Sequence, residues 1–393
     1  MKARANFLVL LALSGLAVFG RDNPNANAPE PRWKIDLKDR FNFEAFDRAI
    51  TFRWTLQQNV DFLSDDKVLV YQVNRSRAPV KLAPRDASGG SGNFILDIRV
   101  LSAQDGHEIK ALRLTTNAEA TEVLPTRDGR FLVRTGDVLY LYSAGFQKIA
   151  EKPLPLQRKV IEEAWQIDVS PSGKHIVLVH QQIFKRDQLS PMSEIEKSTA
   201  DVEILKEETL ETESKFSLPW FLASWSAGEH VLLSSKPFPS LDPALFGWLD
   251  YHGNWTPLSV AEYSPGQHCT YQATVLDDQF FAAYGCGTLS VCRQNGQTVF
   301  SIKSASKEYV GSVKGTGSSL AVQMERHLVR TDGSANIPIR VTKPLRIDVY
   351  DTANRKPVLS APVHGDRIYY AVTQQGALAV VDGTSLVLYH TGR

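Results

Sequence analysis

The sequence is poor in the residues and motifs that most often carry catalysis or bind metals. It has 3 cysteines and 9 scattered histidines in 393 residues. The His-Glu-x-x-His zinc motif, the Gly-x-Ser-x-Gly nucleophile elbow and the Walker phosphate loop are all missing. His175 and His180 are five positions apart on an expected strand, so they face opposite sides and do not share a metal. The sequence therefore predicts no catalytic residue, no metal and no cofactor.

An excess of charge of one sign is also missing. Lysine and arginine total 44, while aspartate and glutamate total 43. A general nucleic-acid-binding protein needs a net basic field, so this balance argues against nucleic acid as the partner. Apolar residues make up 43% of the chain, which is too much for a disordered protein.

Apolar runs that would comfortably span a membrane are lacking as well. The candidate run, Phe7 to Phe19, is shorter than the roughly 20 residues of a transmembrane helix and has the length of the apolar part of a signal peptide. Lys2 and Arg4 precede it, and Gly20 is small enough for cleavage after that residue. We therefore expect export to the periplasm or outside the cell. An uncleaved N-terminal anchor is the alternative.

These features predict the domain organisation. Residues 1–20 are expected to be the signal peptide, and residues 21–31, which are rich in Asn, Pro and Ala, a linker. Residues 32–393 are expected to form a single domain, and no later stretch approaches a membrane span.

Helical patterns are nearly absent, and short apolar runs instead pair across tight polar turns seven times. Gly, Asp and Asn supply the backbone conformations that hairpin turns need. The turns are Ser64-Asp65-Asp66, Arg127-Asp128-Gly129, Pro171-Ser172-Gly173, Ala227-Gly228-Glu229, Leu276-Asp277-Asp278, Gly315-Thr316-Gly317 and Gln374-Gln375-Gly376.

A second turn follows most of these pairs, as in Ser102 to Gly106 and Asp351 to Asn354. The strands that enter it alternate between apolar and polar residues, with Leu345, Ile347 and Val349 on one side. Each unit therefore holds four strands, which we call a, b, c and d. Seven such units favour an all-β, seven-bladed β-propeller, because a closed ring leaves few exposed strand edges. Two packed β-sandwiches are the alternative.

The last unit supplies only three strands, so an N-terminal strand is expected to close the ring. Ile50 to Thr55 lies just before the first strand a, where a strand d belongs, and is the predicted closing strand. Residues 32–41 also have a strand-like pattern and compete for this role.

Three segments resemble a known superfamily. Asp168-Val-Ser-Pro-Ser-Gly-Lys-His-Ile-Val-Leu resembles the Ser-Pro-Asp-Gly-Lys repeat of TolB-like and YVTN-type bacterial propellers, and Thr126-Arg-Asp-Gly-Arg-Phe-Leu is a weaker copy. Val349-Tyr-Asp-Thr-Ala-Asn-Arg-Lys-Pro-Val resembles the c–d turn of the same WD-repeat-like superfamily and of quinoprotein amine dehydrogenase-like propellers. The other turns lack Ser-Pro, and the Trp-docking motif of quinone-cofactor propellers is missing. The resemblance implies the fold and no particular ligand.

A disulfide between Cys269 and Cys286 is predicted, because disulfides persist in exported proteins. Counting outward from a hairpin centred between Asp277 and Asp278 makes the two cysteines direct neighbours. Cys292 is then expected to be a buried free thiol on strand c. The rival pairing joins Cys286 to Cys292.

The links between strands b and c predict the binding face. In an antiparallel blade, all b–c and d–a links share one face of the ring, and we expect long b–c loops over residues 74–93, 185–200, 236–245 and 327–343. Long loops on one side indicate a surface built for a task, although drift in surface loops is the simpler explanation. Two of these loops lean basic and supply the candidate residues for an anionic ligand or partner: Arg75, Arg77, Lys81, Arg85, Arg330, Arg340 and Lys343.

Two functions are compatible with these patterns. The favoured hypothesis is an exported, non-catalytic propeller that binds a protein or a small anionic ligand. The alternative is an exported propeller enzyme, a hydrolase or lyase, with carboxylates or histidines converging at a pore mouth. The aromatic residues of the 220–255 segment are expected to form core between blades, with a sugar-stacking platform as the alternative.

Overall fold

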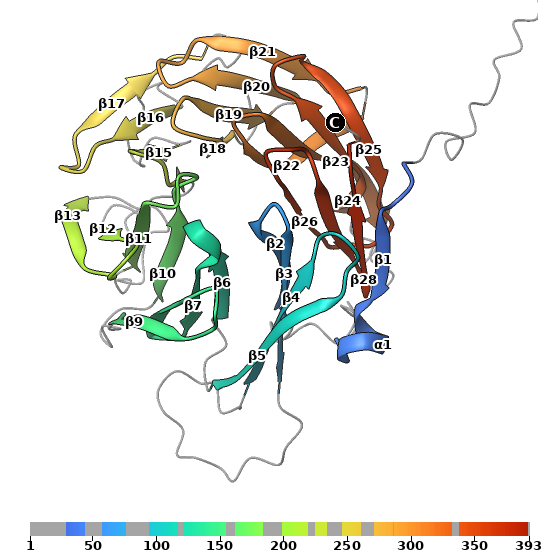
Figure 1. Ribbon diagram of the computed structural model, residues 1–393. Coiled ribbons are helices and arrows are strands. Elements are labelled where there is room, and N and C mark those ends of the chain that lie inside the picture. The colour runs from blue at the N-terminus through green and yellow to red at the C-terminus, as the bar shows by residue number, and fades with distance from the viewer. Residues whose placement is uncertain are drawn as a thin grey trace, which may run out of the picture.

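The computed structural model forms a ring of seven four-stranded antiparallel sheets (Figure 1). It describes residues 29–43, 57–75, 94–116, 121–154, 162–183, 199–218, 225–233, 246–260, 271–285, 287–305, 307–331 and 338–391. The expected all-β, seven-bladed β-propeller is thus confirmed. Within these ranges, no helix has the length and apolar character needed to span a bilayer.

The blades follow one another along the chain, each running from strand a at the centre to strand d at the rim. Blade 1 holds β2 (Gln57–Ser64), β3 (Lys67–Arg75), β4 (Phe94–Ser102) and β5 (Glu108–Thr116). Blade 2 holds β6 (Thr121–Pro125), β7 (Phe131–Thr135), β8 (Val138–Tyr142) and β9 (Lys148–Pro153), with the short 3-10 turn η1 (Arg127–Gly129) between the first two. Blade 3 holds β10 (Glu162–Val169), β11 (His175–Ile183), β12 (Thr199–Lys206) and β13 (Thr212–Leu218).

The second half of the ring repeats this order. Blade 4 holds β14 (Trp225–Ser226), β15 (Val231–Leu233), β16 (Phe246–Leu249) and β17 (Trp255–Leu258). Blade 5 holds β18 (Gln272–Val275), β19 (Phe280–Gly285), β20 (Thr288–Arg293) and β21 (Thr298–Lys303). Blade 6 holds β22 (Glu308–Thr316), β23 (Ser319–Thr331), β24 (Pro338–Asp351) and β25 (Lys356–Pro362). Blade 7 holds β26 (Ile368–Val372), β27 (Leu378–Asp382) and β28 (Ser385–Tyr389), and its rim strand is β1 (Trp33–Asp36).

The core consists of seven hydrophobic clusters, one at each contact between neighbouring blades. Inner strands are apolar on both faces because each face packs on a different blade. In β3, for example, Val68 and Val70 pack toward blade 7, whereas Leu69 and Tyr71 pack toward blade 2. The described aromatics of the 220–255 segment belong to the clusters on either side of blade 4, as expected for core between blades.

The ring is closed by β1, which pairs antiparallel with β28 from Trp33↔Leu388 to Asp36↔Ser385. Closure by an N-terminal strand is therefore confirmed. The segment predicted for it, Ile50 to Thr55, was wrong, because the competing segment 32–41 takes this place. Residues 50–55 lie outside the described ranges. The helix α1 (Leu37–Phe41) follows β1 and buries Leu37 and Phe41 between blades 7 and 1, where Phe43, two residues past the helix, is buried as well.

Candidate functional site

Three charged residues on the inner strands of different blades interact through the charge of Lys314. They are Asp61 on β2, Asp168 on β10 and Lys314 on β22, which belong to blades 1, 3 and 6. The ammonium nitrogen of Lys314 lies 4.0 Å from Oδ2 of Asp61. Its charge also lowers the pKa of Asp168, although burial has the larger, opposite effect. We call these three residues the channel cluster.

Asp168 links blade 3 to blade 4. Its Oδ2 accepts a hydrogen bond from the backbone N–H of Ala227 at 2.8 Å and one from the Ser226 hydroxyl at 3.4 Å. Its Oδ1 accepts from the N–H of Val169 at 2.9 Å. The Ser226 oxygen accepts in turn from the N–H of Val275 in blade 5, at 3.1 Å. A chain of hydrogen bonds therefore joins three consecutive inner strands.

Burial dominates the ionisation of both carboxyl groups in the channel cluster. It raises the pKa of Asp168 to about 6, against the opposing effects of its hydrogen bonds and of Lys314. Burial also raises the pKa of Asp61, which Lys314 and the N–H of Phe62 oppose. Burial thus makes charge costly at both aspartates. Both oxygens of Asp168 accept hydrogen bonds, whereas in Asp61 the Oδ1 atom accepts from the N–H of Phe62 at 2.8 Å.

The chemistry of this cluster is mainly structural. Since Asp168 accepts from three donors, its carboxylate is held in place rather than aimed at a substrate. In the described part of the chain, no three His, Cys, Asp or Glu side chains are grouped so as to hold a metal ion. Sequence reasoning missed the channel cluster, although a charged residue inside an apolar strand a was a visible signal.

A long hairpin extends one b–c connection. β23 and β24 stay paired from Ser319↔Asp351 out to Thr331↔Pro338. This is well past the last pairs with the flanking strands β22 and β25, which are Glu308↔Arg326 and Arg346↔Pro362. The expected loop over residues 327–343 is therefore wrong in part, since most of it is a two-stranded ribbon. We call residues 326–331 and 338–343 the arm.

The arm carries a basic pair at its base. Arg326 and Lys343 are direct cross-strand partners, and both side chains are exposed. The ring of His327 lies 4.1 Å from that of Tyr309, in an edge-on contact that anchors the arm to β22.

The predicted binding residues are divided between the arm and the first b–c connection. Lys343 is placed with its side chain, whereas Arg330 and Arg340 are placed only by strand register, on β23 and β24. Arg75 ends β3, paired with Phe94. The remaining three lie outside the described residues: Arg77, Lys81 and Arg85. Arg326 was missed, because the candidate residues were taken only from the expected loop, which began at residue 327.

Two cavities stand out among the described residues. The larger, about 720 Å³, is a groove between blades 1 and 2, which we call the interblade groove. It is lined by Leu114, Thr115, Thr116, Thr135, Asp137, Val138, Tyr140, Tyr142 and Lys148. The smaller, about 340 Å³, lies between the a–b and c–d turns of blade 5 and is lined by Asp278, Gln279, Phe280, Arg293, Gln294 and Asn295.

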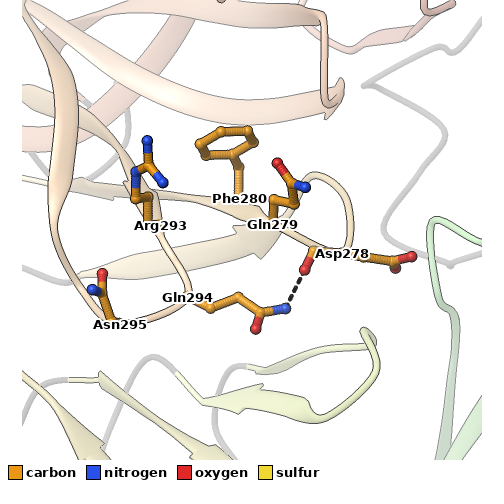
Figure 2. A pocket seen from close by; sticks show the side chains of 6 residues that line it. All are labelled: Asp278, Gln279, Phe280, Arg293, Gln294 and Asn295. Atoms are coloured by element: carbon orange, nitrogen blue, oxygen red, sulfur yellow. Dashed lines mark hydrogen bonds between the residues drawn. The ribbon is translucent and has the colours of Figure 1, made fainter.

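The smaller cavity is bordered by polar turn residues (Figure 2). The Gln294 side chain points at Asp278 and donates to its carbonyl oxygen, and the N–H of Gln294 donates to the Gln279 carbonyl at 3.1 Å. These bonds tie the two turns together, and they explain the residues without a ligand.

The described part of the cysteine hairpin has a different register from the one assumed. Gln272 pairs with Tyr284 and Val275 with Phe281, so the hairpin is centred on Asp278. Its pairing therefore differs by one residue from that of a hairpin centred between Asp277 and Asp278. Cys269 and Cys286 lie outside the described residues. Their disulfide stays a prediction, and the observed register differs from the one on which that prediction was based. Mapping of unreduced peptides tests it, and three free thiols would refute it. Cys292 is buried on strand c, as expected.

Comparison with known proteins supports the fold alone. No protein-family model and no curated protein sequence matches the chain. The acylaminoacyl peptidase of Pyrococcus horikoshii matches over 87% of this chain and 53% of its own, at 9% identity and a TM-score of 0.51. This chain thus spans about half the length of that peptidase.

Two further solved structures show similar coverage. The β-propeller domain of the Trilobed protease from Pyrococcus furiosus is 10% identical, covers 85% of this chain and 95% of its own, and has a TM-score of 0.48. BamB from Moraxella catarrhalis is 8% identical, covers 85% and 99%, and has a TM-score of 0.39.

Proposed function

We propose that the protein is an exported, non-catalytic propeller that binds an anionic ligand or an acidic protein surface through the face of its b–c connections. The observation that carries this proposal is the exposed pair of Arg326 and Lys343 at the base of the arm. Like charges directly opposite each other on neighbouring strands are destabilising. A bound anion would offset that cost.

On β22, Glu308 is the cross-strand partner of Arg326. Hydrogen bonding to Arg346 is the main cause that lowers the pKa of Glu308, and the charge of Arg326 adds a smaller effect. Both of its carboxylate oxygens are held by Arg346, at 2.9 and 3.1 Å. Basic charge at the arm is therefore available to a partner.

The shape of the arm supports the same conclusion. Beyond Arg326 and Arg346 no third strand flanks it in the described residues. A two-stranded ribbon is marginally stable alone, and a tight turn would connect β23 to β24 equally well. Gly136 and Asp137 form such a turn between β7 and β8. The extra length thus adds surface to one face of the ring.

Polyanion binding tests the proposal. The full mature chain is passed over immobilised heparin and over immobilised poly-glutamate at low salt, beside the double variant Arg326→Glu/Lys343→Glu. We expect the double variant to lose retention, and wild-type retention to fall steeply with salt because exposed charges are screened. Lys356→Glu, at the start of β25 on the opposite face, is the matched control and should elute like wild type. Equal retention of all three proteins would refute the proposal.

Export needs a separate test, because residues 1–28 lie outside the described ranges. Expression of the full sequence in a bacterium, followed by fractionation and N-terminal sequencing, should yield a soluble exported protein that begins at Arg21. A protein retained in the cytoplasm with Met1 intact would contradict this part of the proposal.

A pore-mouth enzyme is the second candidate, favoured only by the raised pKa of Asp168. If Asp168 is catalytic, reagents in the channel must be able to reach its carboxyl group. Carbodiimide coupling with glycine ethyl ester, read by peptide mass spectrometry, should leave Asp168 unlabelled if its role is structural. The exposed Asp39 serves as the positive control.

A further inference from the structure

Two groups at the base of the arm change their charge with pH. Glu325 and His327 lie two residues apart on β23, so their side chains leave the same face of that strand. The exposed pair of Arg326 and Lys343 leaves the opposite face. The arm itself contains four basic residues and no carboxylate, so His327 is its one group that changes charge between about pH 5 and about pH 8.

Glu325 is held in place by its neighbours. The side-chain amide of Gln323 donates to its Oε1 at 2.6 Å, and its carboxylate covers Gly311 of β22, where any larger residue would collide with it. Burial raises the pKa of Glu325, against the opposing effects of the Gln323 hydrogen bond and of the charge of His327. The charge of Glu325 contributes to raising the pKa of Tyr370 on β26, although burial is the main cause, so this hydroxyl stays protonated near neutral pH.

His327 contacts both neighbouring strands. Its ring meets that of Tyr309 on β22, with centroids 4.1 Å apart, and its Nδ1 lies 3.5 Å from the Thr342 hydroxyl oxygen on β24. Neither of these partners is charged near neutral pH. Arg340 is placed by register two residues beyond Thr342. A proton on His327 therefore adds a positive charge beside the cations of the arm, with Glu325 as its acidic neighbour.

Both groups make the base of the arm more positive as pH falls. His327 gains a positive charge on protonation, whereas Glu325 loses a negative one, and it does so at a higher pH than an exposed glutamate because its pKa is raised. A unit charge about 10 Å from a bound anion changes the affinity roughly twofold in water at low salt. Since the two changes have the same sign, together they should strengthen anion binding about fourfold.

We propose that Glu325 and His327 form a pH switch beneath the arm, which strengthens the binding of anions at Arg326 and Lys343 as the surroundings become more acidic. The inference rests on the proposed function, because it concerns regulation of the same site. It assigns to Glu325 and His327 a role that neither has in the fold alone, since their contacts with Gln323, Tyr309 and Thr342 would hold the arm equally well with uncharged side chains of similar size.

Heparin binding by the full mature chain, measured at low salt at about pH 8 and about pH 5.5, tests the inference. Heparin suits this test because its sulfate groups stay ionised in that range. Wild type should bind about fourfold more tightly at the lower pH, and the double variant Glu325→Gln/His327→Gln should lose that gain. Glu325→Gln alone should bind about twofold more tightly than wild type at the higher pH. His252→Gln, in an exposed turn of the opposite face, is the matched control and should follow wild type.

A second measurement needs only the wild-type protein. Because linkage is reciprocal, saturating heparin should make the His327 ring take up its proton at a higher pH, as followed by NMR of the ring protons. An unmoved ring titration would overturn the inference, and so would an equal pH response of heparin binding in wild type and in Glu325→Gln/His327→Gln. Either result would leave the proposed function intact. Absence of heparin binding at every pH would instead refute the proposed function, and the switch with it.

Discussion

Two carboxylates, Glu207 and Asp168, are each held by several neighbours at a contact between blades. The side chain of Glu207 is 1% exposed and accepts a hydrogen bond from the Thr126 hydroxyl at 2.6 Å. It also forms ion pairs with Arg130 at 3.0 Å and with Arg127 at 3.5 Å. These contacts join blade 3 to blade 2. Asp168 plays the same part between blades 3 and 4. A charged residue in an apolar strand is visible in the sequence, but no local pattern predicts its partners, because these are brought together only when the ring closes.

Glu207 and Glu208 offer a matched pair of adjacent carboxylates. Glu207→Ala should lower the free energy of unfolding by about 3–5 kcal/mol, because it leaves two arginines without their buried partner. Glu208 is 61% exposed and pairs with Arg127 at the surface, so Glu208→Ala should cost below about 1 kcal/mol. Urea unfolding of both variants measures the difference. Similar losses in the two would contradict the ion-pair account.

Asp168 should give stability a recognisable pH dependence. An aspartate in the unfolded chain titrates near pH 3.9, whereas the pKa of Asp168 in the fold is about 6. Between these values the folded state binds more protons than the unfolded state. The contribution of this group to stability therefore falls as pH rises from about 4 to about 6, and is then constant.

Asp168→Asn, which cannot titrate, isolates this effect. The free energy of unfolding of wild type minus that of the variant should decline across the window from about pH 4 to about pH 6, as measured by urea unfolding at several pH values. Other titrating groups cancel in the difference. A difference independent of pH would mean that Asp168 has an ordinary pKa in the fold.

Among the elements, hairpins with local turn signals were predictable and long-range partners were not. Turns such as Arg127-Asp128-Gly129 lie where expected, because glycine and aspartate take up the left-handed conformations there, with Gly129 at φ 70°. The arm was missed because Pro344 interrupts the strand pattern. In the structure Pro344 pairs with Glu325 at a register shift, a place where a sheet tolerates proline. Two N-terminal segments looked like strands, and only pairing with the distant β28 decides between them.

The closing segment should be essential to blade 7. Residues 29–43 supply β1, together with Leu37 and Phe43 of the cluster between blades 7 and 1. A chain that starts at residue 44 should lose amide-exchange protection throughout β28, and unfold at lower urea than a chain that starts at residue 29. Blades 3 to 5, on the far side of the ring, should keep their protection pattern. Unchanged protection of β28 would mean that another segment closes the ring.

In the whole molecule, blade 7 differs from the other blades in the order in which the chain supplies its strands, but not in how those strands pair. In blades 1 to 6 strand d follows strand c along the chain, whereas in blade 7 it comes from the other end. Yet β1 lies antiparallel to β28, as every other strand d lies to its strand c. The backbone of Arg32 even donates to the Leu388 carbonyl at 2.8 Å, so the start of β1 adjoins the end of β28.

Moving the closing segment to the other end of the chain should therefore preserve the fold. A permuted chain that runs from residue 44 to 393, then through a short glycine-rich turn into residues 29–43, makes blade 7 a continuous four-stranded unit. All inter-blade clusters can form as before, and closing blade 7 across a short turn costs less chain entropy than joining segments some 350 residues apart. We expect the permuted chain to match the chain of residues 29–393 in circular dichroism and to unfold at equal or higher urea. Restored exchange protection of β28, lost in the chain that starts at residue 44, would show that closure depends on the contacts of β1 and not on its place in the sequence. A permuted chain that stays open would show that residues 44–56, which link β1 to β2, are themselves needed to hold the ring closed.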